Sequence, residues 1–260
     1  MYSSKMQYDK RGRDATTRSV KRAKQDNPEL DYAIITQMKV FMGEPEGRKL
    51  FFDTYTNGSY SMTDQISIVN STKDLKRFLV TSKREWDTSK PLLLVITYKN
   101  HYTGIRVDNT AITLFDPNYN HGLYAPITKS MKAVIKTVFK KEIQEYTETC
   151  QVTNDEADSF CQTWSLYLLT HPYFQPPEKT CDRLKLILSL YKKMLSSKQG
   201  RKRYTDFLNV VYLVGRSDTG NPITINDALS IRNMKDERFI RALYATTEEF
   251  LNKNYECLKF

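Results

Sequence analysis

The chain has 260 residues and a net charge of +10, from 40 basic and 30 acidic side chains. Hydrophobic residues make up 40% of it and aromatic residues 12%, which is typical of a folded protein with a substantial core. No apolar run approaches the roughly 18 residues of a membrane span, and the N-terminus is polar. We therefore expect neither a transmembrane helix nor a signal peptide, and a protein that is neither membrane-bound nor secreted.

Basic residues gather first at the N-terminus, where residues 1–29 hold eight Lys or Arg and four Asp or Glu. The sequences KRGR and KRAK, separated by a polar spacer, resemble a bipartite nuclear-import signal. A flexible, disordered basic arm over residues 1–30 is the alternative interpretation. With the basic clusters at 129–141 and 198–203, the arm suits non-specific contact with DNA or another polyanion. A solvated surface that serves only solubility explains the same charge.

Mixed short elements are expected between residues 31 and 90. The segment 49–62 (KLFFDTYTNGSYSM) predicts a pair of strands, because Asn57-Gly58 is a dipeptide typical of tight hairpin turns. A helix is expected to begin near Ser71, in the segment STKDLKRFLVTSKREW.

Three strands are expected after this helix. Residues 92–97 form a short apolar run, as in a strand that is buried on both faces. Residues 101–107 and 111–116 alternate between apolar and polar side chains, and the residues between them predict a tight turn.

The register of this hairpin decides how His101 and Asp116 lie. If Asp108-Asn109 is the loop, the two residues lie directly opposite each other, and if Asn109-Thr110 is the loop, they are diagonal neighbours. Side chains alternate with a period of two, so both registers place them on one face. The same face carries apolar side chains and is expected to pack against the core: Ile105, Val107, Ile112 and Leu114.

Cys161 opens a strongly apolar segment that predicts a central, mostly buried helix. The polar residues 154–159 offer several side chains able to cap it. A cysteine in the first turn of a helix feels the positive end of the helix dipole, which favours the thiolate. We expect this helix to deliver Cys161 to the face that carries His101 and Asp116. Histidine, carboxylate and cysteine are the groups needed to make and use a thiolate at neutral pH.

The remaining elements are mostly helical. Residues 129–141 predict a helix with lysines around an apolar face of Met131, Val134, Ile135 and Val138. A strand is expected at 143–152, and prolines 172, 176 and 177 break the chain after the Cys161 helix. Further helices are expected at 178–200, 203–214 and 236–254, with 198–203 as a loop between helices.

The order His101, Asp116, Gln151, Cys161 resembles that of the cysteine peptidases grouped with the adenovirus protease (adenain) and Ulp1, the SUMO protease. The resemblance covers about residues 90–175. In that group an aromatic residue follows the histidine, an acidic residue closes the next strand, and a glutamine precedes the cysteine. The segment FCQTWSLYLL is most similar to the versions found in large DNA viruses.

This resemblance implies an α+β fold with a papain-like core, in which the helix bearing the cysteine packs on a mixed, mostly antiparallel sheet. The basic arm would occupy residues 1–30, the peptidase core 31–177, and a helical extension packed on the core 178–260. It also implies that Cys161 is the nucleophile, His101 the base, Asp116 its orienting carboxylate and Gln151 an oxyanion donor. The implied substrates are viral precursor proteins or ubiquitin-like conjugates, cleaved after small residues such as glycine.

The chain departs from the family pattern at three points. Tyr102 stands where the family usually has tryptophan, and Gln162 follows the cysteine where glycine is common. Gln151 lies ten residues before the cysteine, whereas the family glutamine lies about six before it. Asn154 is therefore a rival oxyanion donor, and Asn118 is a rival to Asp116.

The cysteines and histidines limit other chemistry. The four cysteines have neither CxxC nor zinc-site spacing, so no metal or cofactor is expected. Without a secretory signal we expect a reducing compartment, in the virion or the host cytoplasm or nucleus, where Cys161 stays a free thiol. His121 and His171 lie in loop-like contexts and are not expected to be catalytic.

Two functions of other classes fit parts of the sequence. One is a virion structural protein that retains the peptidase fold without using its activity. The other is a basic, aromatic-rich accessory protein that binds nucleic acid.

Overall fold

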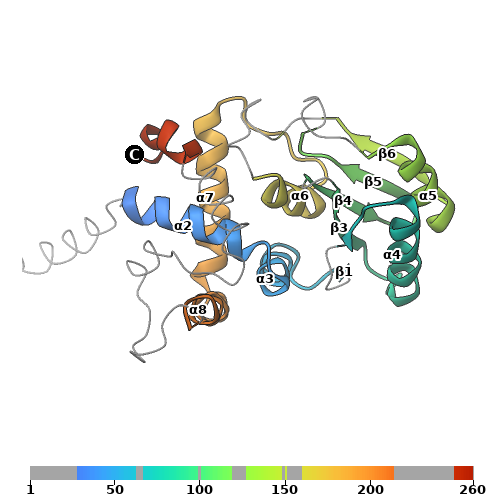
Figure 1. Cartoon of the computed structure of the whole chain (residues 1–260), viewed down its shortest axis with the longest axis horizontal. Coiled ribbons are helices and arrows are strands. Elements are labelled where there is room, and N and C mark those ends of the chain that lie inside the picture. Colours follow the sequence, from blue (N-terminus) through green and yellow to red (C-terminus); the bar gives the residue numbers. More distant parts are fainter. Residues whose placement is uncertain are drawn as a thin grey trace, which may run out of the picture.

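A mixed six-stranded sheet lies between layers of helices in the computed structural model of the chain (Figure 1). The structure describes residues 28–62, 67–98, 101–118, 127–147, 150, 160–213 and 249–259. The fold is α+β, as the sequence predicts.

The strand order is β1-β3-β4-β5-β6, and β2 also pairs with β3. The strands are β1 (Ser61–Met62), β2 (Ser67–Ile68), β3 (Leu92–Tyr98), β4 (His101–Val107), β5 (Ala111–Phe115) and β6 (Glu142–Tyr146). The neighbours β3, β4 and β5 are antiparallel, whereas β1, β2 and β6 join the sheet in parallel. The sheet is mixed, as predicted, but it is not mostly antiparallel, because three of the five described strand pairs are parallel.

The β4–β5 hairpin adopts the second of its two predicted registers. Ile105 pairs with Leu114, and the Asp108 N–H donates to the Ala111 carbonyl at 3.0 Å, so the loop is Asn109-Thr110. His101 and Asp116 are therefore diagonal neighbours at the open end of the hairpin.

One face of the sheet is covered by α4 (Thr72–Glu85) and α5 (Lys129–Phe139) (Figure 1). Both helices are capped, because the Ser71 and Thr128 hydroxyls accept N–H bonds from the first turns. Their apolar faces and those of the central strands form one buried cluster, which includes Leu75, Leu79, Leu94, Ile96, Ile105, Val107, Ile112, Leu114, Met131, Ile135 and Val138. The predicted apolar face of residues 129–141 is confirmed.

The other face is covered by α6 (Cys161–Thr170), with α3 (Pro45–Thr56) beside it (Figure 1). A Cβ atom added to Gly104 of β4 would lie 2.9 Å from Cγ of Leu169, which shows how closely α6 approaches the strand. Arg106 Nη1 donates to the Leu169 carbonyl at 2.9 Å, and Ser165 Oγ donates to the Tyr102 carbonyl at 3.0 Å. Contacts therefore fix α6 along the length of β4.

A further helical layer lies beyond α6 and α3, on the side away from the sheet (Figure 1). It contains α2 (Pro28–Phe41), α7 (Thr180–Ser196), α8 (Lys198–Leu213), the helical residues 249–253 and the 3-10 turn η1 (Tyr255–Leu258). Side chains of α2, α3, α6, α7 and the C-terminal residues share one hydrophobic cluster.

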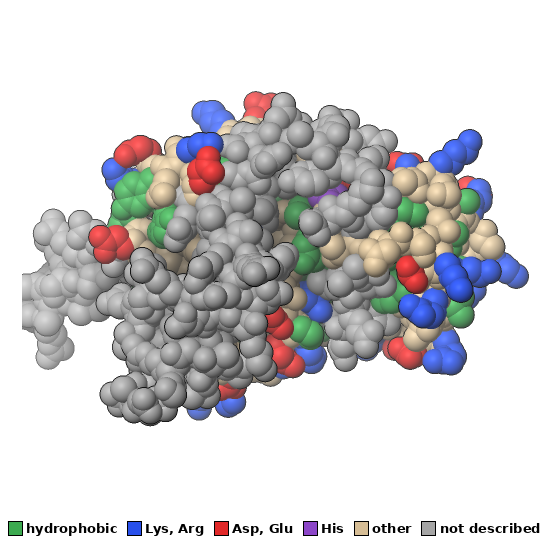
Figure 2. Space-filling view, viewed as in Figure 1, with side chains coloured by type: hydrophobic (Ala, Val, Ile, Leu, Met, Phe, Trp, Pro, Cys, Tyr) green, Lys and Arg blue, Asp and Glu red, His purple; other side chains and the backbone are tan. Residues whose placement is uncertain are grey.

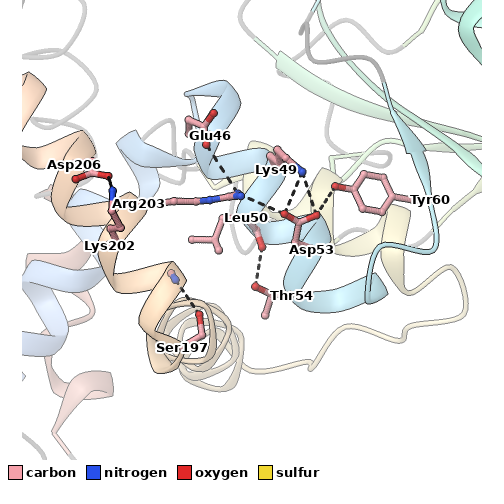
Figure 3. Close-up of polar contacts among 11 residues, drawn as sticks. Glu46, Lys49, Leu50, Asp53, Thr54, Tyr60, Ser197, Lys202, Arg203 and Asp206 are labelled. Carbon is pink, nitrogen blue, oxygen red and sulfur yellow. Dashed lines mark hydrogen bonds and ion pairs between the residues drawn. The ribbon is translucent and has the colours of Figure 1, made fainter.

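Polar contacts fasten α3 to α8, as Figure 3 shows. Asp53 of α3 accepts from Lys49 Nζ, from Tyr60 Oη at 2.8 Å and from Arg203 Nη1 of α8 at 3.4 Å. The same Arg203 nitrogen lies 3.9 Å from Glu46. The position of α3 is therefore held on its outer side by α8.

Two secondary-structure predictions are wrong. Residues 49–56 are helical, because Phe51, Phe52 and Tyr55 recur at helical spacing and Pro45 starts α3. Asn57 ends this helix in the left-handed conformation (φ 51°) and Gly58 follows at φ 73°, so the Asn-Gly pair ends a helix instead of turning a hairpin. Residues 198–203 belong to α8 and are not a loop.

The cysteines divide into two kinds. Cys150 and Cys161 are free and buried, whereas Cys181 of α7 and Cys257 of η1 form a disulfide. The disulfide departs from the expectation of a reducing compartment, in which thiols stay reduced. Among the helices of the described residues, none combines the length and apolar character needed to cross a bilayer.

Candidate active site

His101 and Asp116 are joined by a short hydrogen bond. His101 Nε2 lies 2.6 Å from Asp116 Oδ1, and both residues are buried. The Asn118 backbone N–H donates to the same carboxylate oxygen at 3.0 Å. The predicted pairing of His101 with Asp116 on one face is confirmed, and Asn118 supports the carboxylate through its backbone.

Cys161 reaches this pair from the opposite side of the sheet. Along α6, Cys161 interacts with His101, Ser165 bonds to Tyr102 and Leu169 lies against Gly104. Residue numbers rise in the same order on both elements, so α6 runs in the same direction as β4. The predicted packing of the helix on the face of His101 and Asp116 is wrong, because that face belongs to α4 and α5. Instead, the first residue of α6 meets the first residue of β4 at the end of the sheet.

The electrostatics of His101 follow from these neighbours. Burial by itself lowers the pKa of the imidazole, but hydrogen bonds to Asp116 and Cys161 and the charges of both groups outweigh burial. The pKa of His101 is therefore raised to about 9. Because Nε2 bonds to Asp116, Nδ1 is the ring nitrogen that can bond to the Cys161 sulfur. A protonated His101 would then lie between the carboxylate and the thiolate.

The start of α6 leaves backbone donors near the sulfur. Phe160 occupies the N-cap position without a capping side-chain bond, and residues 154–159, which were expected to cap the helix, lie outside the described residues. The first N–H groups of any helix lack intrahelical partners and carry the positive end of its dipole. The N–H of Cys161 is one of these donors, and an oxyanion forming beside Sγ is a suitable acceptor for it.

The predicted oxyanion donors Gln151 and Asn154 lie outside the described residues. Cys150, which directly precedes Gln151, is held beside the site. Its N–H donates to the carbonyl of Pro117 at 2.9 Å, and its own carbonyl accepts from Arg183 at 2.9 Å.

The other histidines do not join this cluster where the structure describes them. His171 stacks on Tyr167, with ring centroids 4.2 Å apart, and its Nδ1 lies 2.8 Å from the Thr170 hydroxyl. His121 lies outside the described residues. In the part of the chain that the structure describes, no three His, Cys, Asp or Glu side chains are grouped as a metal ion requires.

Sequence reasoning missed two buried polar residues near Cys161. The Gln162 amide donates to the carbonyl of Met42, and Arg48 Nη1 donates to the carbonyl of Gly43 at 2.5 Å. The only signal for Gln162 was its place where the family often has glycine. Arg48 gave no signal, because a single arginine in a helix usually faces solvent.

No family model and no curated protein matches the chain. The geometry of Cys161, His101 and Asp116 therefore carries the functional argument.

Proposed function

We propose that the chain is a cysteine endopeptidase with a papain-like core of the adenovirus-protease and SUMO-protease kind. The observation that carries this proposal is the convergence of three groups from separate elements at one end of the sheet. Asp116 follows β5, His101 begins β4 and Cys161 begins α6. A nucleophile, a base within its reach and a group that orients the base are the parts that acyl transfer needs.

The proposed reaction begins from a Cys161 thiolate and a protonated His101. The thiolate attacks the scissile carbonyl carbon, and the Cys161 N–H and Gln151 hold the oxyanion. His101 then gives the proton on Nδ1 to the leaving amine, and a thioester to Cys161 remains. Water, deprotonated by His101, hydrolyses the thioester and restores the thiol. Asp116 keeps the imidazole oriented and its charged form stabilised throughout.

The resemblance supports a protein substrate cut after a small residue, in a viral precursor protein or a ubiquitin-like conjugate. The same resemblance favours action inside the virion or in the host cytoplasm or nucleus. No metal or other cofactor enters this mechanism.

A covalent probe tests the proposal. We expect a short peptide ending in glycine vinyl sulfone to label the wild-type chain at a single cysteine, identified by peptide mapping. Cys161→Ala should abolish the labelling because it removes the attacking sulfur. Cys150→Ala is the matched control, since Cys150 is the other free and buried thiol, and it should leave labelling in place. A folded chain that resists the probe would instead favour a virion structural protein that keeps the fold without activity.

A second proposal concerns polyanions. Figure 2 shows Lys and Arg side chains gathered at the end of the molecule formed by α4 and α5. Lys73, Lys76, Lys129 and Lys140 are exposed there. Non-specific DNA binding by this surface should weaken with salt, by a log–log slope of about −0.9 for each phosphate neutralised. Replacing the four lysines by glutamine should flatten the slope, and an unchanged slope would exclude this surface.

A further inference from the structure

Gln162 ties the first turn of α6 to a distant part of the chain. It directly follows Cys161 and is 7% exposed, and its side-chain amide donates to the main-chain carbonyl of Met42. Met42 begins the turn between α2 and α3, some 120 residues earlier in the sequence. A buried amide that bonds to main chain fixes the separation of the two segments it joins.

Arg48 holds the other side of the same turn. Its guanidinium is buried, at 3% exposure for the residue, and donates to the carbonyl of Gly43 at 2.5 Å. The turn also has its own backbone bonds, from Gly43 N–H to Val40 at 2.9 Å and from Glu44 N–H to Phe41 at 3.0 Å. Residues 42–44 therefore form a hydrogen-bonded turn, to which Arg48 of α3 and Gln162 of α6 each donate a side-chain bond.

The helix α3, which follows this turn, is also held in place. Arg203 of α8 binds Asp53 on the outer side of α3 (Figure 3), so α3 cannot shift without breaking that contact. On the inner side, the pKa of Tyr102 is raised, first by burial and then by the charge of Cys161, with Arg48 acting in the opposite direction. Cys161 and Arg48 are thus each close enough to act on Tyr102.

We propose that Gln162 and Arg48 are positioning residues, which hold residues 42–44 against the first turn of α6 and so fix Cys161 relative to His101. This inference rests on the proposed function. Gln162 lies in the first turn of α6 and anchors it to the turn between α2 and α3 through its bond to Met42. A family member with glycine after the cysteine would lack this anchor.

The test compares two buried glutamines. Gln162→Met keeps the volume of the side chain and removes its donor, and we expect alkylation of Cys161 by iodoacetamide to slow about ten- to a hundredfold, as for a displaced reacting group. The pKa of His101, followed by NMR, should fall below that of the wild type because the Cys161 sulfur acts on it less. Gln37→Met is the control, since Gln37 is 2% exposed and accepts from Tyr204, while its amide nitrogen donates to no residue of the described chain. This control should lower the melting temperature. It should change the alkylation rate of Cys161 by no more than about twofold and leave the pKa of His101 as in the wild type.

Arg48→Met supplies an independent check. If Arg48 and Gln162 act through the same turn, the double variant should lose little more reactivity than the more severe single variant. Additive losses would overturn the shared turn, and unchanged reactivity in Gln162→Met would overturn the inference. A wild-type Cys161 no more reactive than Cys150 would instead reject the proposed function itself.

Discussion

His101 lies between two groups that can both carry negative charge. Asp116 is 2.6 Å from its Nε2, and Cys161 interacts with the same ring. A buried imidazole is ordinarily neutral, because burial disfavours the charged form. Here the two partners reverse that preference, so the protein holds a cation inside the site at neutral pH.

The raised pKa of His101 predicts how stability depends on pH. The folded value of about 9 lies above the ordinary 6.5, so the contribution to stability is fully present below about pH 6.5 and is lost as pH rises through about 9. We expect the difference in unfolding free energy between wild type and His101→Gln, measured in urea at pH 6, 8 and 10, to shrink with rising pH. A difference that grows with pH would contradict the ion pair.

Asp116→Asn tests which group orients the imidazole. The substitution removes the charge while keeping the size, so the pKa of His101 should fall and peptide hydrolysis should slow on the order of 10³–10⁴-fold, as in other triads. Asp108→Asn is a suitable control, because Asp108 pairs with Arg106 in the same hairpin at 2.8 Å, away from His101. A loss with Asn118→Ala but not with Asp116→Asn would move the orienting role to Asn118.

The sequence predicted His101 and Asp116 well because one hairpin contains both, and the period of two fixes their common face. It did not predict Gln162 or Arg48, whose partners lie on another element. Such contacts depend on how helices pack, and no local pattern encodes that packing.

At the scale of elements, helix α6 is placed by its fit to β4. Gly104 provides room for Leu169, and Arg106 and Ser165 add polar contacts along the interface. The sequence predicted both elements but assigned the helix to the wrong face. The alternation marks one face of the hairpin as apolar, but helices cover both faces of the sheet, so periodicity alone could not tell which helix packs on which face.

Gly104→Ala should separate α6 from β4. Its Cβ would lie 2.9–3.2 Å from three carbon atoms of Leu169, and such overpacking typically costs about 1–3 kcal/mol of unfolding free energy. Urea denaturation measures the loss. Adding Leu169→Ala should make the combined loss smaller than the sum of the single losses, and strict additivity would contradict the close approach.

At the scale of the whole molecule, the C-terminal residues return to α6, the helix that begins at Cys161. Phe250 packs on Phe160, the residue before Cys161, with ring centroids 5.9 Å apart. The disulfide between Cys181 and Cys257 fastens this segment to α7. The sequence predicted a helical extension but not its pairing of cysteines, which lie 76 residues apart and have no characteristic spacing.

Removing this disulfide should destabilise the protein. The variant with Cys181→Ala and Cys257→Ala should lose about 2–4 kcal/mol of unfolding free energy, because the 76-residue loop is no longer closed in the unfolded chain. A reducing agent should lower the stability of the wild type and leave that of the double variant unchanged. Four titratable thiols in the unreduced, unfolded wild type would show that the disulfide does not form.

Activation of Cys161 by His101 is the central claim, and competitive alkylation tests it most directly. At pH 6.5 an ordinary thiol is only about one per cent ionised, so iodoacetamide reacts with it slowly. We predict that Cys161 in the folded wild type reacts about ten- to a hundredfold faster than Cys150, as quantified by mass spectrometry, and that His101→Gln removes most of this advantage. The His101→Gln comparison separates activation from the slightly greater exposure of Cys161. Equal rates for the two cysteines, or a Cys161 rate that His101→Gln leaves unchanged, would contradict the account.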